Sequence, residues 1–195
     1  MKKTYYLLML ACGLFLSTQH SFAQKDSSGI YKTALDFQQR KLSYAINCKV
    51  EKHKINANVL FKGAKVKVKH RGTTYTFRKS EVFGYRACDG QQYRFVDNTE
   101  YSILNPVESL LLYFYQHPAH SAKDINQYPP MYFFSKEATS SLQQLTKANL
   151  KAAFPDDHKF HDALDTNFKN DKELYAYDSF HKMYKLNWLL KNYKN

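Results

Sequence analysis

Polar and apolar residues alternate strictly in one stretch of the first half of the chain. Residues 64–69 read AKVKVK, so alanine or valine occupies every second position and lysine every position between. Successive side chains of a strand point to opposite faces, and this stretch therefore predicts a half-buried strand. The following stretch TTYTFR, after Arg71-Gly72, alternates again through Tyr75 and Phe77. We expect the two stretches to pair as a β-hairpin.

A second hairpin is indicated where FGYRAC and QQYRFV flank an Asp-Gly pair at residues 89 and 90. Asp-Gly is favoured in the two-residue type I′ turn, because both central residues need positive φ. Such a turn would place Cys88 opposite Gln91 and Arg86 opposite Tyr93.

Further strands are expected near residues 100–104, 107–115 and 130–134. The stretch QHPAHSAKDINQYPP between the last two has three prolines, which interrupt regular pairing, and it reads as a loop. The pattern predicts an antiparallel β-meander that curls into a barrel or sandwich.

The hydrophobic period changes to that of helices from about Leu145. Thr146 fits an N-cap, with Leu145 and Leu150 spaced as a hydrophobic staple, so we expect a short helix that ends at Phe154. Pro155 stops this helix and can open the next one. A last helix is expected over residues 172–191, because apolar residues recur there at 3,4 spacing. Its stripe consists of Leu174, Tyr177, His181, Tyr184 and Trp188. The fold class is therefore α+β, with a β-rich part followed by about three helices.

The N-terminal segment has the pattern of a signal peptide. Lys2 and Lys3 precede an apolar run, and Ser21-Phe22-Ala23 supplies the small-x-small cleavage pattern. We expect residues 1–23 to be removed, with residues 24–135 forming the β-rich part and residues 136–195 a helical part that packs on it. The chain would then be exported to the periplasm or the extracellular space. Lipidation at Cys12 is the alternative, which the apolar residues after it disfavour. No later stretch approaches the roughly 18 apolar residues of a membrane span.

Only Cys48 and Cys88 remain after that cleavage. An even pair in an exported protein predicts a disulfide, which closes a long loop and stabilises by roughly 4 kcal/mol in the chain-entropy model. Two buried free thiols are the alternative.

Positive charge is concentrated in residues 49–79. This segment carries ten lysines and arginines against Glu51 alone, a balance of +9, whereas the formal charge of the whole chain is +12. Cleavage of the signal peptide removes two lysines and leaves +10, so the rest contributes only +1. The candidate anion-binding residues are Lys65, Lys67, Lys69 and Arg71. They would attract lipopolysaccharide phosphates, an acidic polysaccharide or an acidic protein partner; nucleic acid is disfavoured by export. The alternative is that these lysines only prevent edge pairing and maintain solubility.

Histidines and aspartates cluster in FPDDHKFHDALD, residues 154–165. On a helix, one face would carry His158, His161, Asp162 and Asp165, opposite an apolar stripe of Phe160, Leu164 and Phe168. This polar face could hold a metal ion or perform acid-base chemistry, although metal sites usually draw ligands from several elements. The alternative is a solvated face with i,i+4 pairs.

Catalytic motifs are scarce. The chain has no G-x-S-x-G elbow, Walker motif or dinucleotide glycine pattern, and we expect no cofactor. Many hydrolases lack local motifs, so enzymatic activity stays open. The loop with His117, His120 and Asp124 is a second candidate active site, since long loops often carry function.

Five segments together resemble a family of small exported proteins of Bacteroidota, usually described only as uncharacterised. They are GIYKTALDF, INCKVEKHKI, FGYRACDGQQYRF, TKANLKAAFPDDHKFHDALD and YDSFHKMYKLN, and the leader resembles signal peptides of that phylum. The resemblance implies export and a β half before a helical half. It supplies no catalytic or binding residues.

Two functions follow as hypotheses. The first is a non-enzymatic binding or structural protein of the cell envelope, whose basic strand surface meets an anionic polymer or acidic protein. The second is a metal-dependent enzyme or metal-handling protein that uses the His/Asp helix face.

Overall fold

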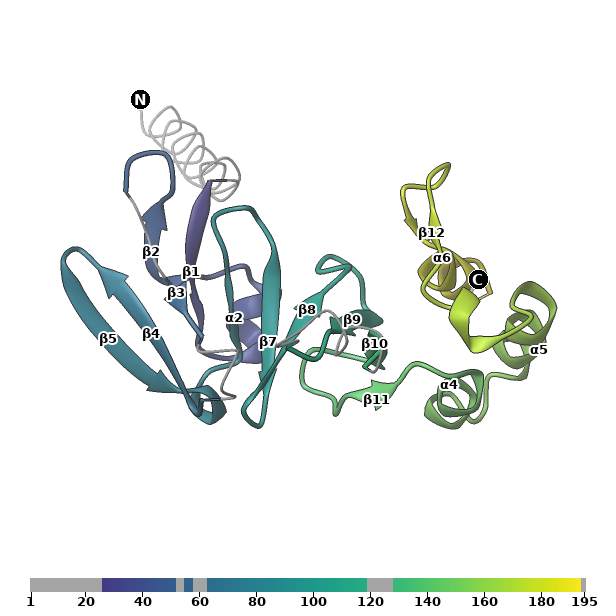
Figure 1. The fold of residues 1–195 in the computed structure, drawn as a ribbon. Helices are drawn as coiled ribbons and strands as arrows, with labels where there is room; N and C mark the ends of the chain where they lie inside the picture. The colour runs from purple at the N-terminus through teal and green to yellow at the C-terminus, as the bar shows by residue number, and fades with distance from the viewer. Residues whose placement is uncertain (1–25, 52–54, 58–62, 119–127, 194–195) are drawn as a thin grey trace, which may run out of the picture.

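The computed structural model describes residues 26–51, 55–57, 63–118 and 128–193 (Figure 1). The expected signal peptide and Cys12 lie outside these residues. In the described part, β-strands fill the first half of the chain and helices gather in the second. The α+β class and the order of its two parts are therefore confirmed.

Eight strands form one antiparallel sheet, in the order β11-β10-β9-β8-β7-β6-β1-β2. From β6 to β11 the strands follow one another along the chain, so the predicted meander is confirmed. The strands are β1 (Ser27–Tyr31), β2 (Ser43–Asn47), β6 (Gly84–Arg86), β7 (Gln92–Val96), β8 (Thr99–Ile103), β9 (Leu111–Tyr115), β10 (Met131–Ser135) and β11 (Gln143–Gln144).

A smaller sheet has the order β3-β4-β5, with β3 (Ile55–Asn56), β4 (Lys65–His70) and β5 (Thr73–Arg78). The first predicted hairpin is thus confirmed. Arg71 and Gly72 both have positive φ, 48° and 82°, as a two-residue type I′ turn requires. The short 3-10 helix η2 (Lys79–Glu81) then leads into β6.

The two sheets pack face to face, which gives this end of the molecule a sandwich-like core. The cluster between them consists of Ile30, Ala57, Val66, Val68, Val82, Tyr85 and Phe95. Val66 and Val68 are fully buried, and the lysines that alternate with them are exposed. The alternation read from the sequence therefore gives the correct inward face.

The second hairpin forms, but its predicted register is wrong. Arg86 pairs with Gln92, and Ala87 N–H donates to the carbonyl of Gln91 over 2.9 Å, so three residues lie in the loop. Of these only Gly90 has positive φ, at 88°. This geometry matches a type I turn followed by a left-handed glycine, which accommodates Asp-Gly as well as a type I′ turn does.

Cys48 and Cys88 form a disulfide that joins the end of β2 to this turn. The predicted bridge is confirmed. It links segments 40 residues apart in the sequence.

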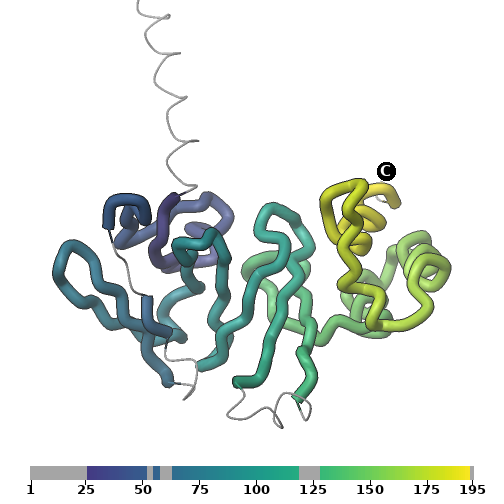
Figure 2. The backbone as a smooth tube through the Cα atoms, turned by 45° about the horizontal axis from the view of Figure 1, so that its top comes forward, coloured from purple at the N-terminus to yellow at the C-terminus, as the bar shows by residue number. Residues whose placement is uncertain are grey.

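Both faces of the large sheet are covered. In β9 and the residue before it, Leu110 and Leu112 belong to one buried cluster, and Leu111 and Tyr113 to another. The register aligns Ile30, Tyr85, Tyr93, Ser102, Phe114 and Tyr132 in one row on the first face. The small sheet and the C-terminal helices therefore cover the same face at opposite ends, as Figure 2 also shows. The other face is covered by α2 (Ala34–Gln38), a short helix capped by Thr33 that the sequence analysis missed.

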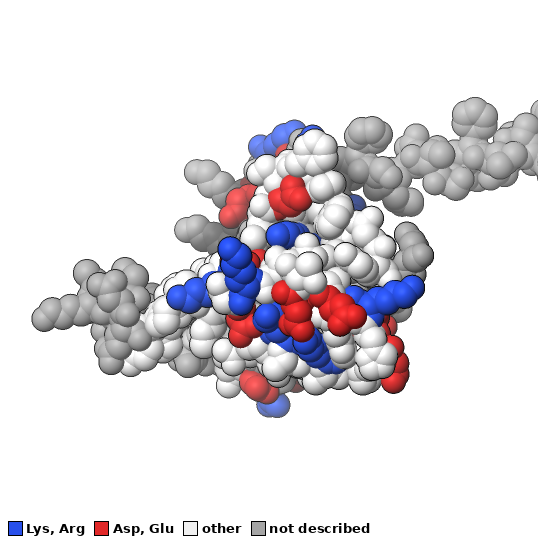
Figure 3. Space-filling model, turned by 90° about the vertical axis from the view of Figure 1, so that its right-hand side faces the viewer, with Lys and Arg blue, Asp and Glu red and all other residues white. Residues whose placement is uncertain are grey.

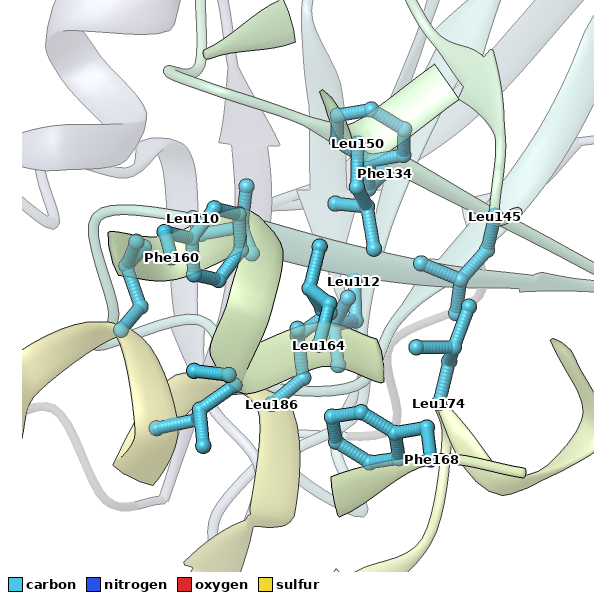
Figure 4. Close-up of a cluster of buried hydrophobic side chains, with 13 residues drawn as sticks. Leu110, Leu112, Phe134, Leu145, Leu150, Phe160, Leu164, Phe168, Leu174 and Leu186 are labelled. Carbon is cyan, nitrogen blue, oxygen red and sulfur yellow. The ribbon is translucent and has the colours of Figure 1, made fainter. Parts of the chain in front are cut away.

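The C-terminal helices begin as the capping residues dictate. Thr146 caps α4 (Lys147–Ala153), as predicted, by accepting the N–H of Asn149. The next helix, α5 (His158–Asn167), starts later than expected, because Asp157 rather than Pro155 opens it by accepting the N–H of Phe160. Both helices pack through Leu150, Phe160 and Leu164 on Leu112 and Phe134 of the sheet (Figure 4).

The long last helix predicted over residues 172–191 is wrong. Its first half instead forms the short 3-10 helix η3 (Asp171–Glu173) and a small hairpin of β12 (Tyr177–Asp178) and β13 (Met183–Tyr184), and α6 (Lys185–Tyr193) is the part that is α-helical. The Asp178 carboxylate accepts the N–H groups of Phe180 and His181, which closes the turn. Local side-chain hydrogen bonds of this kind compete with the helical ladder.

No helix in the described ranges is long and apolar enough to span a membrane.

Candidate functional site

The outward face of the small sheet carries a row of lysines, which we call the lysine face: Lys65, Lys67 and Lys69 of β4 with Arg78 of β5. All four side chains are exposed, while the residues between the lysines are buried. Fixed backbone alternation therefore holds the three ammonium groups on one side of the sheet.

Threonines lie beside these lysines. Lys67 is opposite Thr76 and Lys69 is opposite Thr74, whereas Lys65 is opposite Arg78. Thr74 and Thr76 are exposed and short, so they leave space on the sheet surface next to the longer lysine side chains. The lysine face therefore places positive charge beside short polar side chains, and Lys65 and Lys67 also line an open pocket with Asn56, Gly63 and Ala64.

No carboxylate neutralises the three lysines within the part of the chain that the structure describes. Arg78 alone lies near an acid, with Nε 3.8 Å from Glu81 Oε1, and both groups are solvent-exposed. Exposed pairs of this type contribute little free energy and are screened by salt. By contrast, lysines, arginines and acids are intermixed over the helical end of the molecule (Figure 3).

Other cations of the basic segment are occupied or lie elsewhere. Lys49 forms an ion pair with Asp26 at 2.6 Å. Lys79 is buried at 1% exposure, and its Nζ donates to the carbonyl of Asn98. Lys52, Lys54 and Lys62 lie outside the described residues. The sequence count of +9 therefore overstates the charge on this one face.

Arg71, the fourth candidate from the sequence, occupies the turn at the end of the β4–β5 hairpin and is exposed. It lies beyond Lys69 at the same end of the strand. The structure thus places the predicted candidates Lys65, Lys67, Lys69 and Arg71 along one hairpin, and it adds Arg78 from the partner strand.

The histidines and aspartates of α5 do not converge on one point. Asp165 forms ion pairs with Lys151 and Lys147 of α4, which hold its pKa below the ordinary value. The Nε2 of His161 lies 2.8 Å from the carbonyl of Phe154. His158 contacts His161 edge-on at 5.8 Å between ring centroids, and Asp162 is exposed.

A metal site is not assembled here. Across the described ranges, no three His, Cys, Asp or Glu side chains are grouped so that they could hold a metal ion. In the other candidate loop, His117 stacks on Tyr128 at 4.6 Å, and its Nδ1 is 3.0 Å from the carbonyl of Pro118. His120 and Asp124 fall outside the described residues.

A buried polar cluster under the small sheet was missed by sequence reasoning. The Tyr85 hydroxyl donates to Glu100 over 3.0 Å, and Lys79 lies close enough for its charge to act on Glu100. Burial raises the pKa of Glu100 and lowers the pKa of Lys79. The alternation of β5 contained the signal, since Phe77 points inward, Arg78 outward and therefore Lys79 inward. Because Lys79 anchors η2 against β7 and β8, we interpret the cluster as a support for the small sheet.

The structure does not test the resemblance to exported Bacteroidota proteins, which stays a prediction. No protein-family model, curated protein or solved structure matches this chain significantly.

Proposed function

We propose that this chain is a binding protein whose lysine face contacts an extended anionic partner outside the cytoplasm. The observation that carries the proposal is the arrangement of Lys65, Lys67 and Lys69, which are exposed on one face and have no acidic partner among the described residues. A solubility role alone requires no such alignment, because scattered lysines serve it equally well.

The spacing of the lysines favours a linear partner. Residues i and i+2 of a strand lie about 7 Å apart, so the three lysines span about 14 Å. The flexible side chains would have to converge before one small anion could contact all three ammonium groups. A chain with negative groups repeated at a similar interval can contact them simultaneously.

The location outside the cytoplasm is supported by the disulfide between Cys48 and Cys88. Disulfides persist in oxidising compartments and are rare in the cytosol. The signal-peptide pattern of residues 1–23 points the same way. Periplasmic, surface-bound and secreted forms all agree with these observations.

The metal hypothesis receives no comparable support. Asp165 is engaged by two lysines, and His161 is directed to a backbone carbonyl. We therefore propose binding through the lysine face and no second function.

A direct test measures the affinity of the purified protein for fluorescent poly-glutamate and for polyphosphate, two linear polyanions of different chemistry. The variant Lys65→Gln/Lys67→Gln/Lys69→Gln should bind about tenfold more weakly, since three exposed charges that contribute about 0.5 kcal/mol each total about 1.5 kcal/mol. A matched control is Lys159→Gln/Lys169→Gln/Lys172→Gln, which removes three exposed lysines from the helical part.

Binding that weakens equally in both triple variants would reduce the effect to net charge and contradict a site. Binding to neither polyanion would contradict the proposal as a whole.

A further inference from the structure

The small sheet ends in an open strand that differs from the other sheet borders. The large sheet terminates in β11 and β2, the small sheet terminates in β3 and β5, and the separate β12–β13 hairpin has strands of only two residues. β3 and β11 have only two residues each, and the pairing of β2 with β1 is irregular between Ser28 and Ile30. β5 has six residues, TTYTFR, and pairs with β4 without any shift in register. It lies at the outer border of the molecule in Figures 1 and 2.

Proteins usually protect such a border with short strands, bulges, prolines or lysines on the edge strand itself. β5 has none of these features, and its only charged residue, Arg78, is its last. The lysines lie one strand further in, on β4. Six regular residues rich in threonine and aromatic side chains are instead well suited to pair with another strand.

The hydrogen-bonding parity of the hairpin shows which backbone groups of β5 face outward. A two-residue type I′ turn makes His70 and Thr73 a hydrogen-bonded pair, and such pairs recur at every second residue. The N–H of Lys79 donates to the carbonyl of Ala64 over 2.8 Å, in the same parity. The backbone groups of Thr73, Tyr75 and Phe77 therefore face β4.

The N–H and C=O groups of Thr74, Thr76 and Arg78 consequently point away from β4. The Arg78 N–H is already accepted by the Glu81 carboxylate over 3.3 Å. In the described part of the chain, no such partner is found for the N–H groups of Thr74 and Thr76. The outward backbone groups of Thr74 and Thr76 could therefore pair with a further strand, whereas Glu81 occupies the N–H at the Arg78 end.

The two faces of β5 define what an added strand must carry. On the outward face, the strand would lie next to Thr74 and Thr76, within reach of Lys69 and Lys67, because the four-carbon lysine side chain extends across the short threonines. On the inward face it would lie next to Tyr75 and Phe77, which are half-buried against Tyr44. Acidic side chains fit the first face, and apolar side chains fit the second.

We propose that the partner of the lysine face is an extended acidic peptide segment that pairs with β5 as an additional antiparallel strand. Its sequence would alternate acidic and apolar residues, so that the acidic residues face Lys67 and Lys69. This inference rests on the proposed function and specifies its partner. Strand addition to a sheet edge combines backbone hydrogen bonds for affinity with alternate side chains for specificity.

A second copy of this chain is a poorer occupant of the same edge. Pairing β5 with its own copy would continue the sheet with another row of lysines and another Arg78 on the same face. Like charges on one face disfavour that assembly, whereas an acidic strand neutralises them.

The test uses a capped synthetic peptide of alternating glutamate and valine as the probe and measures its affinity for the purified protein. Thr76→Pro removes the outward N–H of β5 without removing a donor to β4, since proline is tolerated on the open side of an edge strand. Thr76→Val is the matched control, because it keeps the N–H group. We expect Thr76→Pro to weaken binding about tenfold and Thr76→Val to leave it within about twofold.

A second form of the probe makes the test independent of the variant's folding. Methylation of alternate backbone nitrogens on the hydrogen-bonding side of the peptide leaves its charge unchanged and should abolish binding to the unaltered protein.

The outcomes separate this inference from the proposed function. If the lysine-to-glutamine variant loses the peptide while Thr76→Pro and the methylated peptide bind normally, strand addition is overturned and electrostatic binding stands. If none of these three changes weakens peptide binding, strand addition and the proposed function both fail. If the protein is dimeric without peptide and Thr76→Pro makes it monomeric, a second copy occupies the edge and the peptide proposal is overturned.

Discussion

Asn105, in the turn after β8, donates from Nδ2 to the Oδ1 of Asn187 in α6 over 2.9 Å, and both side chains are almost fully buried. Asn105 also accepts the N–H of Leu112, and both asparagines donate to the carbonyl of Leu110. This small network fixes the last helix to the large sheet.

Replacing Asn105 by leucine should therefore destabilise the protein by about 3 kcal/mol, because it leaves the Leu112 N–H and the Asn187 carbonyl without partners in the core. Chemical denaturation measures the change in the free energy of unfolding. Asn192→Ala is the control, since among the described residues the exposed side chain of Asn192 bonds only to the carbonyl of Trp188, and its effect should stay within about 0.5 kcal/mol. Equal effects of the two substitutions would contradict the role of the network.

Alternation in β4 predicts opposite responses at neighbouring positions. Val68→Ala should lower the free energy of unfolding by about 2 kcal/mol, because Val68 is fully buried between the sheets. Lys67→Gln should change it by less than about 0.5 kcal/mol. A larger stability loss for Lys67→Gln than for Val68→Ala would show that the faces of β4 are reversed.

The disulfide should account for a large part of the stability. The variant Cys48→Ser/Cys88→Ser should have a free energy of unfolding about 4 kcal/mol lower, since the bridge closes a loop of 40 residues. Reductant should lower the unfolding midpoint of the unaltered protein to about that of the variant, and it should leave the midpoint of the variant unchanged. A reductant effect on the variant would point to a cause other than this bridge.

Acid should weaken the β12–β13 hairpin. Hydrogen bonds from His181 and from the N–H groups of Phe180 and His181 hold the pKa of Asp178 below its ordinary value of 3.8. As the pH falls, Asp178 takes up a proton in the unfolded chain at a higher pH than in the folded protein. Its contribution to stability is therefore complete above pH 3.8 and is lost as the pH falls through the lowered pKa.

Asp178→Asn should therefore reduce the loss of thermal stability seen between neutral pH and strong acid, whereas Asp162→Asn, at an exposed position, should not. Thermal melts across this pH range measure both. Identical pH profiles for the unaltered protein and Asp178→Asn would exclude the hairpin as an acid-sensitive element.

Local patterns in the sequence were sufficient for much of the fold. The alternation around Val66 and Val68 gives the inward face of β4, and the Thr146 cap gives the start of α4, because both depend on neighbouring residues alone. The lysine face follows from the same alternation. The outward threonine groups of β5 could not be predicted, since they depend on which strand has no neighbour.

The predicted last helix fails for a specific geometric reason. Tyr177 and Tyr184 are seven residues apart, which places them on one face of a helix after two turns. The same two residues are opposite each other in the β12–β13 hairpin. The spacing fits both structures, and the hydrogen bonds of Asp178 favour the hairpin, even though its turn requires a positive φ of 53° at Lys182. The register error at Asp89-Gly90 has a similar origin, because two turn types accept the same dipeptide.

The measurement that tests the central claim most directly is the salt dependence of polyanion binding. The dissociation constant of poly-glutamate is measured across a salt series for the unaltered protein, for Lys65→Gln/Lys67→Gln/Lys69→Gln and for Lys159→Gln/Lys169→Gln/Lys172→Gln. We predict that affinity falls steeply with salt, and that only the first triple variant flattens this dependence, because contacts with exposed charges are screened and release counterions. Affinity that is indifferent to salt, or the same slope in all three proteins, would contradict binding through the lysine face.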